Sequence, residues 1–181
     1  MSGHVCPSWC SFSLANPFRR LLHHPERILA PYVHAGAVVA DIGCGPGFFT
    51  LAMARLVGAD GHVIAVDLQE KMLRQVRRGA EKAGLLERIS LRLSQAEKIG
   101  ITEKVDFAMT FWMVHEVRDA ALFFRQIRQC LKKSSRYLLC EPKLHVGAAA
   151  FAETVATAQR CGLVPVSTPV IALSRSLLFG I

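Results

Sequence analysis

The chain has 181 residues, of which 51% are hydrophobic and 20% charged, and its 22 Lys and Arg residues against 14 Asp and Glu residues give a formal net charge of +8. This length is typical of one domain, and the apolar fraction excludes an intrinsically disordered chain. Ordinary counts of 13 Gly and 8 Pro exclude a collagen-like or low-complexity chain. The positive charge suggests an acidic partner, such as a nucleic acid or an anionic small molecule, without choosing between them.

The sequence predicts neither a targeting segment nor a membrane span. The first 20 residues mix polar and Cys residues where a secretory signal peptide has a continuous apolar core. The longest apolar stretch, residues 35–59, is interrupted by Asp41 and by glycines, so it is too polar to cross a membrane. Six scattered Cys residues need not form disulfides in a chain of this size, and we expect reduced thiols in a cytoplasmic protein.

In chain order, short apolar runs alternate with amphipathic helical stretches. The apolar runs predict strands at residues 37–41, 62–67, 105–111 and 137–140, and alternating apolar and polar residues predict a further strand at 89–93. The helical stretches predict helices at 48–57, 72–83, 120–131 and 148–161. Gly58, Gly84 and Gly162 are expected to end three of these helices, and Asp119 to be an N-cap. Two further apolar runs, 163–171 and 174–181, predict an antiparallel hairpin.

This alternation predicts an α/β fold with a doubly wound, mainly parallel sheet and helices on both faces. Ligands in such sheets bind at the carboxyl ends of the strands, near the point where the strand order reverses. Residues 31–181 are expected to form this core. Residues 1–30 stand outside the alternation and are interpreted as a lid or substrate segment.

The positive charge is concentrated in two places. Residues 71–92 contain seven basic and two acidic residues, and residues 118–136 contain six basic residues and one acidic residue. Solvated outer faces of helices are the simpler interpretation, and a surface for nucleic acid or another acidic partner is the alternative.

A glycine-rich loop lies between the first predicted strand and the first predicted helix. It reads Asp41-Ile-Gly43-Cys-Gly45-Pro-Gly47, a Gly-x-Gly-x-Gly spacing in which the backbone can turn sharply and approach a ligand. A dinucleotide fingerprint would place its last glycine at position 48, which is Phe48. Asp41 would repel a pyrophosphate and attract a cation, so the loop favours a positively charged nucleoside over NAD.

A second acid, Asp67, closes the second predicted strand. A carboxylate at this place can accept hydrogen bonds from both ribose hydroxyls and would repel a 2′-phosphate. A helix cap is the simpler role for a lone Asp after a strand, but the glycine loop lies one strand–helix–strand unit upstream. The two features together predict a ribose site.

These residues resemble class I S-adenosylmethionine-dependent methyltransferases, in particular the small branch similar to the ubiquinone/menaquinone C-methyltransferases and arsenite methyltransferases. The resemblance runs from about Pro25 to Ile181, and its most specific part is Asp41-x-Gly-x-Gly-x-Gly followed by Val66-Asp67. It implies a Rossmann-like, seven-stranded mixed sheet whose seventh strand is antiparallel, in agreement with the predicted hairpin.

The resemblance also implies the residues that hold the cofactor. Gly43, Gly45 and Gly47 would line its methionine part, Asp41 would anchor its ammonium group, and Asp67 would hold its ribose. The family usually has an Asp after strand three that accepts from the adenine amino group; Gln95 takes that place, and its neutral amide oxygen accepts more weakly. Leu68 would pack on the adenine, and the remaining residues expected at the site are Cys44, Ala96 and Thr110.

Methyl transfer requires alignment of the acceptor and exclusion of water, and a general base only where the acceptor loses a proton. His115, after strand four, is the candidate base, although a structural helix-start role is the alternative. Phe111 and Trp112 are candidates to wall the methyl site or to belong to the core. The Asn/Asp-Pro-Pro-Tyr/Phe and Pro-Cys motifs of nucleic-acid base methyltransferases are absent. RNA therefore remains possible as a methyl acceptor, but no motif supports it.

The amino-terminal segment contains His4, Cys6 and Cys10, followed by His23-His24. These side chains are of the kind that binds a soft metal or metalloid, but Cys-x3-Cys is not a strong zinc spacing. An amphipathic cover packed on the sheet is the simpler interpretation, and we predict no metal site.

The sequence therefore predicts a methyltransferase that moves a methyl group from S-adenosylmethionine to a small-molecule acceptor by in-line displacement, leaving S-adenosylhomocysteine. An RNA methyltransferase, a cofactor-binding scaffold subunit that needs a partner, and a thiol or metalloid methyltransferase remain alternatives. A homodimer is a further open expectation.

Overall fold

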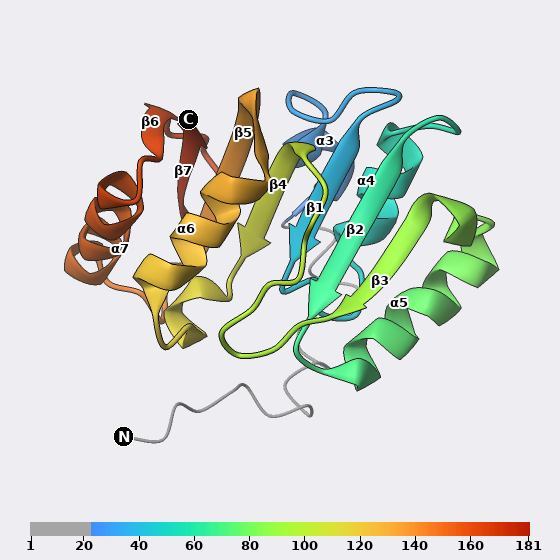
Figure 1. Ribbon diagram of the computed structural model, residues 1–181, viewed down its shortest axis with the longest axis horizontal. Helices are drawn as coiled ribbons and strands as arrows, with labels where there is room; N and C mark the ends of the chain where they lie inside the picture. Colours follow the sequence, from blue (N-terminus) through green and yellow to red (C-terminus); the bar gives the residue numbers. More distant parts are fainter. Residues whose placement is uncertain (1–22) are drawn as a thin grey trace.

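In a computed structural model that describes residues 23–181, the chain forms one mixed sheet flanked by helices (Figure 1). Within these residues the sheet has seven strands in the order β3-β2-β1-β4-β5-β7-β6. The strands are β1 (Val38–Ile42), β2 (His62–Asp67), β3 (Ile89–Leu93), β4 (Val105–Phe111), β5 (Leu131–Pro142), β6 (Val164–Ser167) and β7 (Ser174–Gly180). The neighbours among β1–β5 pair in parallel, whereas β7 is antiparallel to both β5 and β6. The predicted α/β fold with an antiparallel C-terminal hairpin is confirmed.

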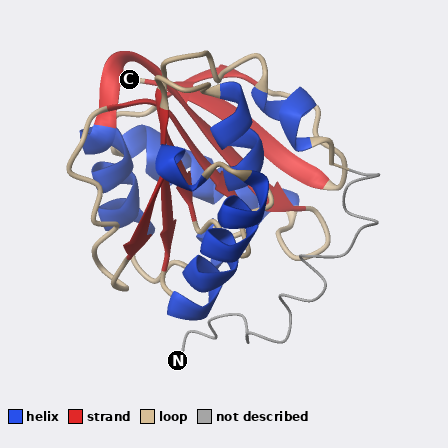
Figure 2. Ribbon diagram, turned by 90° about the vertical axis from the view of Figure 1, so that its right-hand side faces the viewer, coloured by secondary structure: helices blue, strands red, loops and turns tan. Residues whose placement is uncertain are grey.

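Helices cover both faces of the sheet (Figure 2). One face carries α3 (Pro25–Leu29), α4 (Thr50–Leu56) and α5 (Glu70–Ala83), and the other carries α6 (Ala120–Cys130) and α7 (Ala148–Arg160). Two short 3-10 helices are η2 (Leu86–Arg88) and η3 (Val114–Glu116). Gly84 ends α5 in the left-handed conformation, and the Asp119 carboxylate caps α6 by accepting the Leu122 N–H at 2.8 Å, as predicted.

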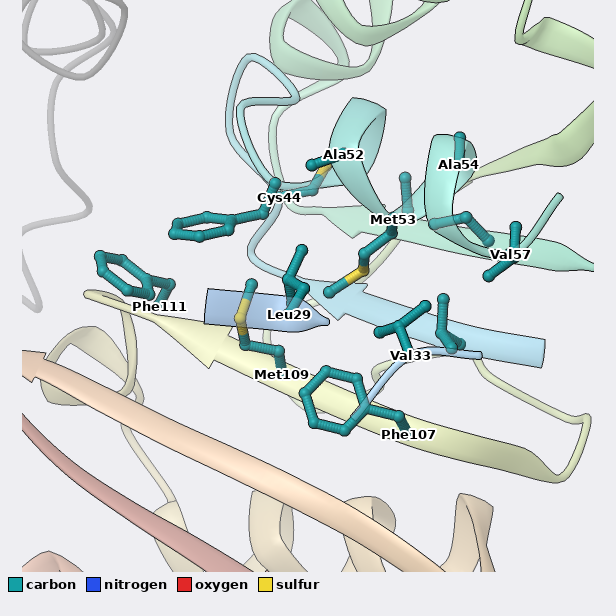
Figure 3. Packing of buried hydrophobic residues seen from close by; sticks show 14 of the residues in the cluster. Leu29, Val33, Cys44, Ala52, Met53, Ala54, Val57, Phe107, Met109 and Phe111 are labelled. Atoms are coloured by element: carbon teal, nitrogen blue, oxygen red, sulfur yellow. The ribbon is translucent and has the colours of Figure 1, made fainter. Parts of the chain in front are cut away.

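The core has two layers because alternate residues of each strand point to opposite faces. On β4, Phe107 and Met109 pack with α3 and α4, as Figure 3 shows, and Ala108 packs with the α6 side. Burial of both faces explains why the central strands are nearly continuous apolar runs in the sequence. Among the described residues, no helix is long and apolar enough for a membrane crossing.

The structure corrects several predicted boundaries. The fifth strand begins at Leu131 rather than 137 because Leu131 pairs with Val105, and the register then shifts so that Phe107 pairs with Arg136. The intervening polar residues 132–135 resemble a loop in sequence. Helix α4 begins at Thr50, since Phe48 still belongs to the turn after the glycine loop, and helix α3 lies within residues 1–30, for which no helix was predicted.

The site follows from this topology. Strand β1 has β2 on one side and β4 on the other, so the connections leaving their carboxyl ends diverge there. The arrowheads of β1–β4 all point toward the lower edge of the sheet in Figure 1. The loops after β1, β2, β3 and β4 therefore meet along one edge.

Candidate cofactor and acceptor site

The glycine-rich loop after β1 has a backbone that favours glycine. Gly43, Gly45 and Gly47 have φ angles of +72°, +53° and +93°, which L side chains rarely adopt. At Gly43 a Cβ would lie 2.7 Å from Met113 Cγ, so even alanine would collide there. At Gly45 a Cβ would meet no heavy atom within 4 Å, so the missing side chain leaves room for a ligand at the loop.

Asp67 joins the end of β2 to this loop. One carboxylate oxygen accepts the Gly45 N–H at 2.9 Å, and the other accepts the Gln69 N–H at 2.8 Å. Burial raises the pKa of the Asp67 carboxyl, and these N–H groups oppose the rise by stabilising the charge. A carboxylate has about four acceptor positions, so both oxygens retain capacity for the two hydroxyls of a ribose.

Asp41 lies at the base of the loop and is almost fully buried. The Thr50 hydroxyl at the start of α4 donates to its carboxylate at 2.6 Å. A buried carboxylate on a cavity wall favours a cationic ligand, because that ligand repays part of the cost of burying the charge.

A cavity of about 210 Å³ opens at this edge of the sheet. Eight of the residues predicted to bind cofactor line it: Asp41, Gly43, Cys44, Gly45, Asp67, Leu68, Gln95 and Ala96. They come from the carboxyl ends of β1 and β2 and from the loops after β1, β2 and β3. Room beside Gly45, the spare acceptor capacity of Asp67 and the negative charge of Asp41 together fit a cationic nucleoside such as S-adenosylmethionine.

Three predicted site residues do not line the cavity. Gly47 is buried, with its Cα facing Val76 of α5, so that a Cβ would lie 3.1 Å from a Val76 methyl group. Thr110 is fully buried in β4, and its hydroxyl hydrogen-bonds the Tyr137 hydroxyl at 2.6 Å. His115 lies on η3, and its neighbour Glu116 is the residue that reaches the cavity.

Aromatic side chains form another part of the cavity wall: Phe48, Phe49, Phe111 and Trp112. Their ring centroids lie 5.1 Å apart for Phe48–Phe49, 4.4 Å for Phe49–Phe111 and 5.3 Å for Phe111–Trp112, so the four rings form one continuous cluster. The sequence suggested Phe111 and Trp112 and missed the two loop phenylalanines, which look like the first turn of a helix.

Trp112 is held in a strained conformation at the end of β4. Its φ is +62°, which is rare for a bulky residue and costs about 1–3 kcal/mol. The backbone N–H donates to the Cys140 carbonyl at 2.8 Å, and the indole N–H donates to the Ser174 hydroxyl at 2.9 Å. These two contacts fix the indole at the cavity wall, and backbone strain of this kind is typical of functional sites.

The His115 imidazole pairs with a buried acid. Its Nδ1 lies 2.5 Å from a carboxylate oxygen of Glu141, which is 1% exposed and whose other oxygen accepts the Val114 N–H at 2.8 Å. The hydrogen bond to Glu141 raises the pKa of His115 above its ordinary value, and burial opposes the shift. The pair therefore ties η3, and with it the cavity-facing Glu116, to the end of β5.

Replacing Glu141 by Gln is expected to lower the pKa of His115 toward its ordinary value of 6.5, because the amide keeps the shape and removes the charge. Because the pKa of His115 is higher in the folded state than in the unfolded state, protonation of His115 stabilises the fold below about pH 6.5. This contribution is lost as the pH rises through the pKa of His115 in the folded state. The stability difference between wild type and Glu141→Gln should thus shrink with rising pH. NMR titration of His115 checks the shift. Glu116→Gln is the comparison variant and should lower the pKa of His115 less, because the Glu116 carboxylate lies 3.9 Å from Nε2 and is the weaker cause of the shift. An unchanged His115 pKa in Glu141→Gln would contradict the assignment.

The candidate metalloid ligands His4, Cys6 and Cys10 lie outside the described residues. His23 is buried, and its ring packs edge-on against Phe111 and Trp112 at centroid distances of 5.3 and 5.2 Å. Within residues 23–181 no group of three or more His, Cys, Asp or Glu side chains is arranged to hold a metal ion.

The helical parts of the two basic clusters lie on opposite faces of the sheet. Exposed Lys71, Arg74 and Arg78 belong to α5, and exposed Arg125 and Arg128 belong to α6. Since α5 and α6 cover different faces, these helices do not combine into one basic surface. The simpler interpretation therefore holds for the part of each cluster on α5 and α6, whereas Arg92 belongs to β3, and Lys132, Lys133 and Arg136 belong to β5.

Comparison with known proteins gives a match for most of the chain. Residues 33–164 match a family model described as a methyltransferase domain. The chain is 42% identical over 76 residues to a probable cobalt-precorrin-6B C(15)-methyltransferase (decarboxylating) of Saccharolobus solfataricus, a match that covers 41% of this chain and 38% of the relative. It is 29% identical over 119 residues to a demethylmenaquinone methyltransferase of Symbiobacterium thermophilum, covering 65% of this chain and 47% of the relative. The chain thus matches less than half the length of either relative.

A solved structure of a SAM-dependent methyltransferase from Aquifex aeolicus shares the fold. It superimposes with a TM-score of 0.86 at 22% identity, covering 97% of this chain and 98% of the other. At this identity the similarity shows the fold alone, and it does not identify the methyl acceptor of this chain.

Proposed function

The chain belongs to the methyltransferase-domain family and uses S-adenosylmethionine, and on that premise we propose that it methylates a small-molecule acceptor whose reacting part is apolar and aromatic. The observation that carries the acceptor assignment is the four-ring wall of the cavity, which adjoins the glycine-rich loop. Aromatic walls bind flat apolar groups by offset stacking and edge-to-face contacts. An aliphatic acceptor could not make these stacking contacts with the rings.

We assign the cofactor contacts to residues at the carboxyl ends of β1 and β2 and in the loops after β1 and β3. Asp67 would accept from the ribose hydroxyls, Asp41 would balance the positive charge of the methionine part, and Gln95 would accept from the adenine amino group. Gly45 would allow the loop backbone to approach the ligand, because nothing occupies the place of its side chain. When bound, S-adenosylmethionine supplies an electrophilic methyl group on a sulfonium.

The protein's own contribution to the reaction is alignment and exclusion of water. The aromatic rings would hold the acceptor against the cofactor end of the cavity. Glu116, which follows Trp112 by four residues, is one of the carboxylates that line the same cavity, and we propose that it accepts the proton of an acceptor that must lose one. His115, whose Nε2 lies 3.9 Å from Glu116 Oε1, would position this carboxylate rather than contact the acceptor.

Trp112→Gly tests the acceptor wall. Glycine tolerates the positive φ at this position, so the change removes the indole without adding backbone strain. We expect the KM for a small aromatic acceptor to rise about tenfold, the loss expected for about 1.4 kcal/mol of stacking and burial. The affinity for S-adenosylhomocysteine should change less than about twofold on the same scale.

Acceptors for this test come from a panel of phenols, N-heteroaromatic compounds and aliphatic acids assayed with methyl-labelled S-adenosylmethionine. Ser174→Ala keeps the indole but removes one of the two contacts that fix it, so its KM should lie between those of the wild type and Trp112→Gly. Methylation confined to aliphatic acids, or a Trp112→Gly variant with wild-type KM, would contradict the proposed acceptor class.

A further inference from the structure

The loop between β3 and β4 lines the cavity but has few contacts with the core. Gln95, Ala96, Glu97 and Lys98 are all exposed, while Ile99 is buried. The Gln95 N–H donates to the Lys98 carbonyl at 3.0 Å and the Lys98 N–H returns to the Gln95 carbonyl at 3.1 Å, which closes a tight turn. An exposed turn of this kind needs an external anchor if its position is to be fixed.

One side chain from α6 supplies that anchor. The Gln126 amide oxygen accepts the Ile99 N–H at 2.9 Å, and the amide nitrogen donates to the Glu97 carbonyl at 3.0 Å. At the other end of the loop, the Ser94 N–H donates to the Asp67 carbonyl at 3.0 Å. The turn is therefore held from α6 on one side and from the end of β2 on the other.

The chemistry of this contact requires a primary amide. A donor and an acceptor must lie side by side to satisfy one carbonyl and one N–H of the loop. A glutamate of equal length would keep the acceptor and place a negative oxygen against the Glu97 carbonyl. Gln126 lines the same cavity as the turn that it holds.

We propose that Gln126 is the positioning residue for the adenine end of the site, because it fixes the turn that carries Gln95 and Ala96. This inference rests on the proposed function, in which that turn contacts the adenine. Gln126 then sets both the affinity for the cofactor and the preference for an adenine over another purine.

The test is calorimetric titration of the full chain with S-adenosylhomocysteine and with its inosine counterpart, in which an oxo group replaces the adenine amino group. Gln126→Met keeps the length of the side chain and removes both hydrogen bonds, while Gln126→Glu keeps the acceptor only. Gln129→Met, on the exposed side of the same helix about one turn later, is the matched control.

We expect Gln126→Met to bind S-adenosylhomocysteine about tenfold more weakly, as for the loss of one to two hydrogen bonds, and Gln129→Met to bind like the wild type. The preference for the adenine form over the inosine form should fall in Gln126→Met. In Gln126→Glu this preference should lie between those of the wild type and Gln126→Met. Amide exchange at Ile99 should accelerate in Gln126→Met while exchange in β1 and β4 stays unchanged.

Two results would overturn the inference. Wild-type affinity in Gln126→Met would show that the turn needs no anchor, and an equal loss for both ligands would show a general effect on the fold. If the wild-type protein binds neither ligand, the cofactor assignment fails, and the inference fails with it.

Discussion

Replacing Asp67 by Ala is expected to lower the affinity for S-adenosylhomocysteine by about a hundredfold or more. Two hydrogen bonds from ribose hydroxyls to a charged acceptor are worth about 1.5–3 kcal/mol each, and a hundredfold loss corresponds to about 2.7 kcal/mol. The variant also leaves the Gly45 and Gln69 N–H groups without the carboxylate that accepts from them, which loosens the glycine-rich loop. Calorimetric titration measures the affinity.

Two further variants provide an intermediate case and a control. Asp67→Asn keeps one acceptor oxygen and the size of the side chain, so its affinity should lie between those of wild type and Asp67→Ala. Asp60→Ala, an exposed acid in the loop before β2, should leave the affinity unchanged. Unaltered affinity in a folded Asp67→Ala protein would exclude Asp67 from the ribose site.

Gly45→Ala should lower both the stability of the protein and its affinity for the cofactor. At φ +53° a Cβ costs about 1–2 kcal/mol of stability, and the added methyl group projects into open space beside the loop. Because the cofactor is assigned to that space, we expect the affinity for S-adenosylhomocysteine to fall about thirtyfold, equivalent to about 2 kcal/mol. Thermal unfolding and calorimetric titration measure the two effects on one sample.

Gly84→Ala is the matched control for this change. Gly84 also has a positive φ, +66°, and also has no heavy atom within 4 Å of an added Cβ, but it ends α5 and does not line the cavity. It should lose the same stability as Gly45→Ala with no loss of affinity. Equal affinities for the two variants would place the cofactor away from the glycine-rich loop.

Much of the fold could be predicted from the sequence because the central strands are buried on both faces. Such strands form continuous apolar runs, and the predicted bounds 62–67 and 105–111 agree with the structure. The bounds 89–93 of the edge strand β3 also agree, because its apolar and polar residues alternate. The caps at Gly84 and Asp119 were also predictable, since each depends on a local backbone requirement. The early start of β5 was not, because the polar residues 132–135 join the sheet only through pairing with distant β4.

Part of the candidate site could also be predicted from the sequence, and part could not. The glycine-rich loop and the acid after β2 have a local spacing that a single sequence reveals. The aromatic wall does not, because Phe48 and Phe49 meet Phe111 and Trp112 only after β1 and β4 become neighbours. Likewise nothing near Gln126 in the sequence indicates the turn that it holds, about thirty residues earlier.

The central claim is that the methyl group reaches a small apolar acceptor in the aromatic-walled cavity. The most direct measurement incubates the protein with a cell extract and methyl-labelled S-adenosylmethionine, then separates solvent-extractable small molecules, RNA and protein. We predict label in the solvent-extractable fraction, its loss with Asp67→Ala, and a strong decrease with Trp112→Gly. Label that appears in the RNA fraction instead, and depends equally on Asp67, would contradict the proposed acceptor.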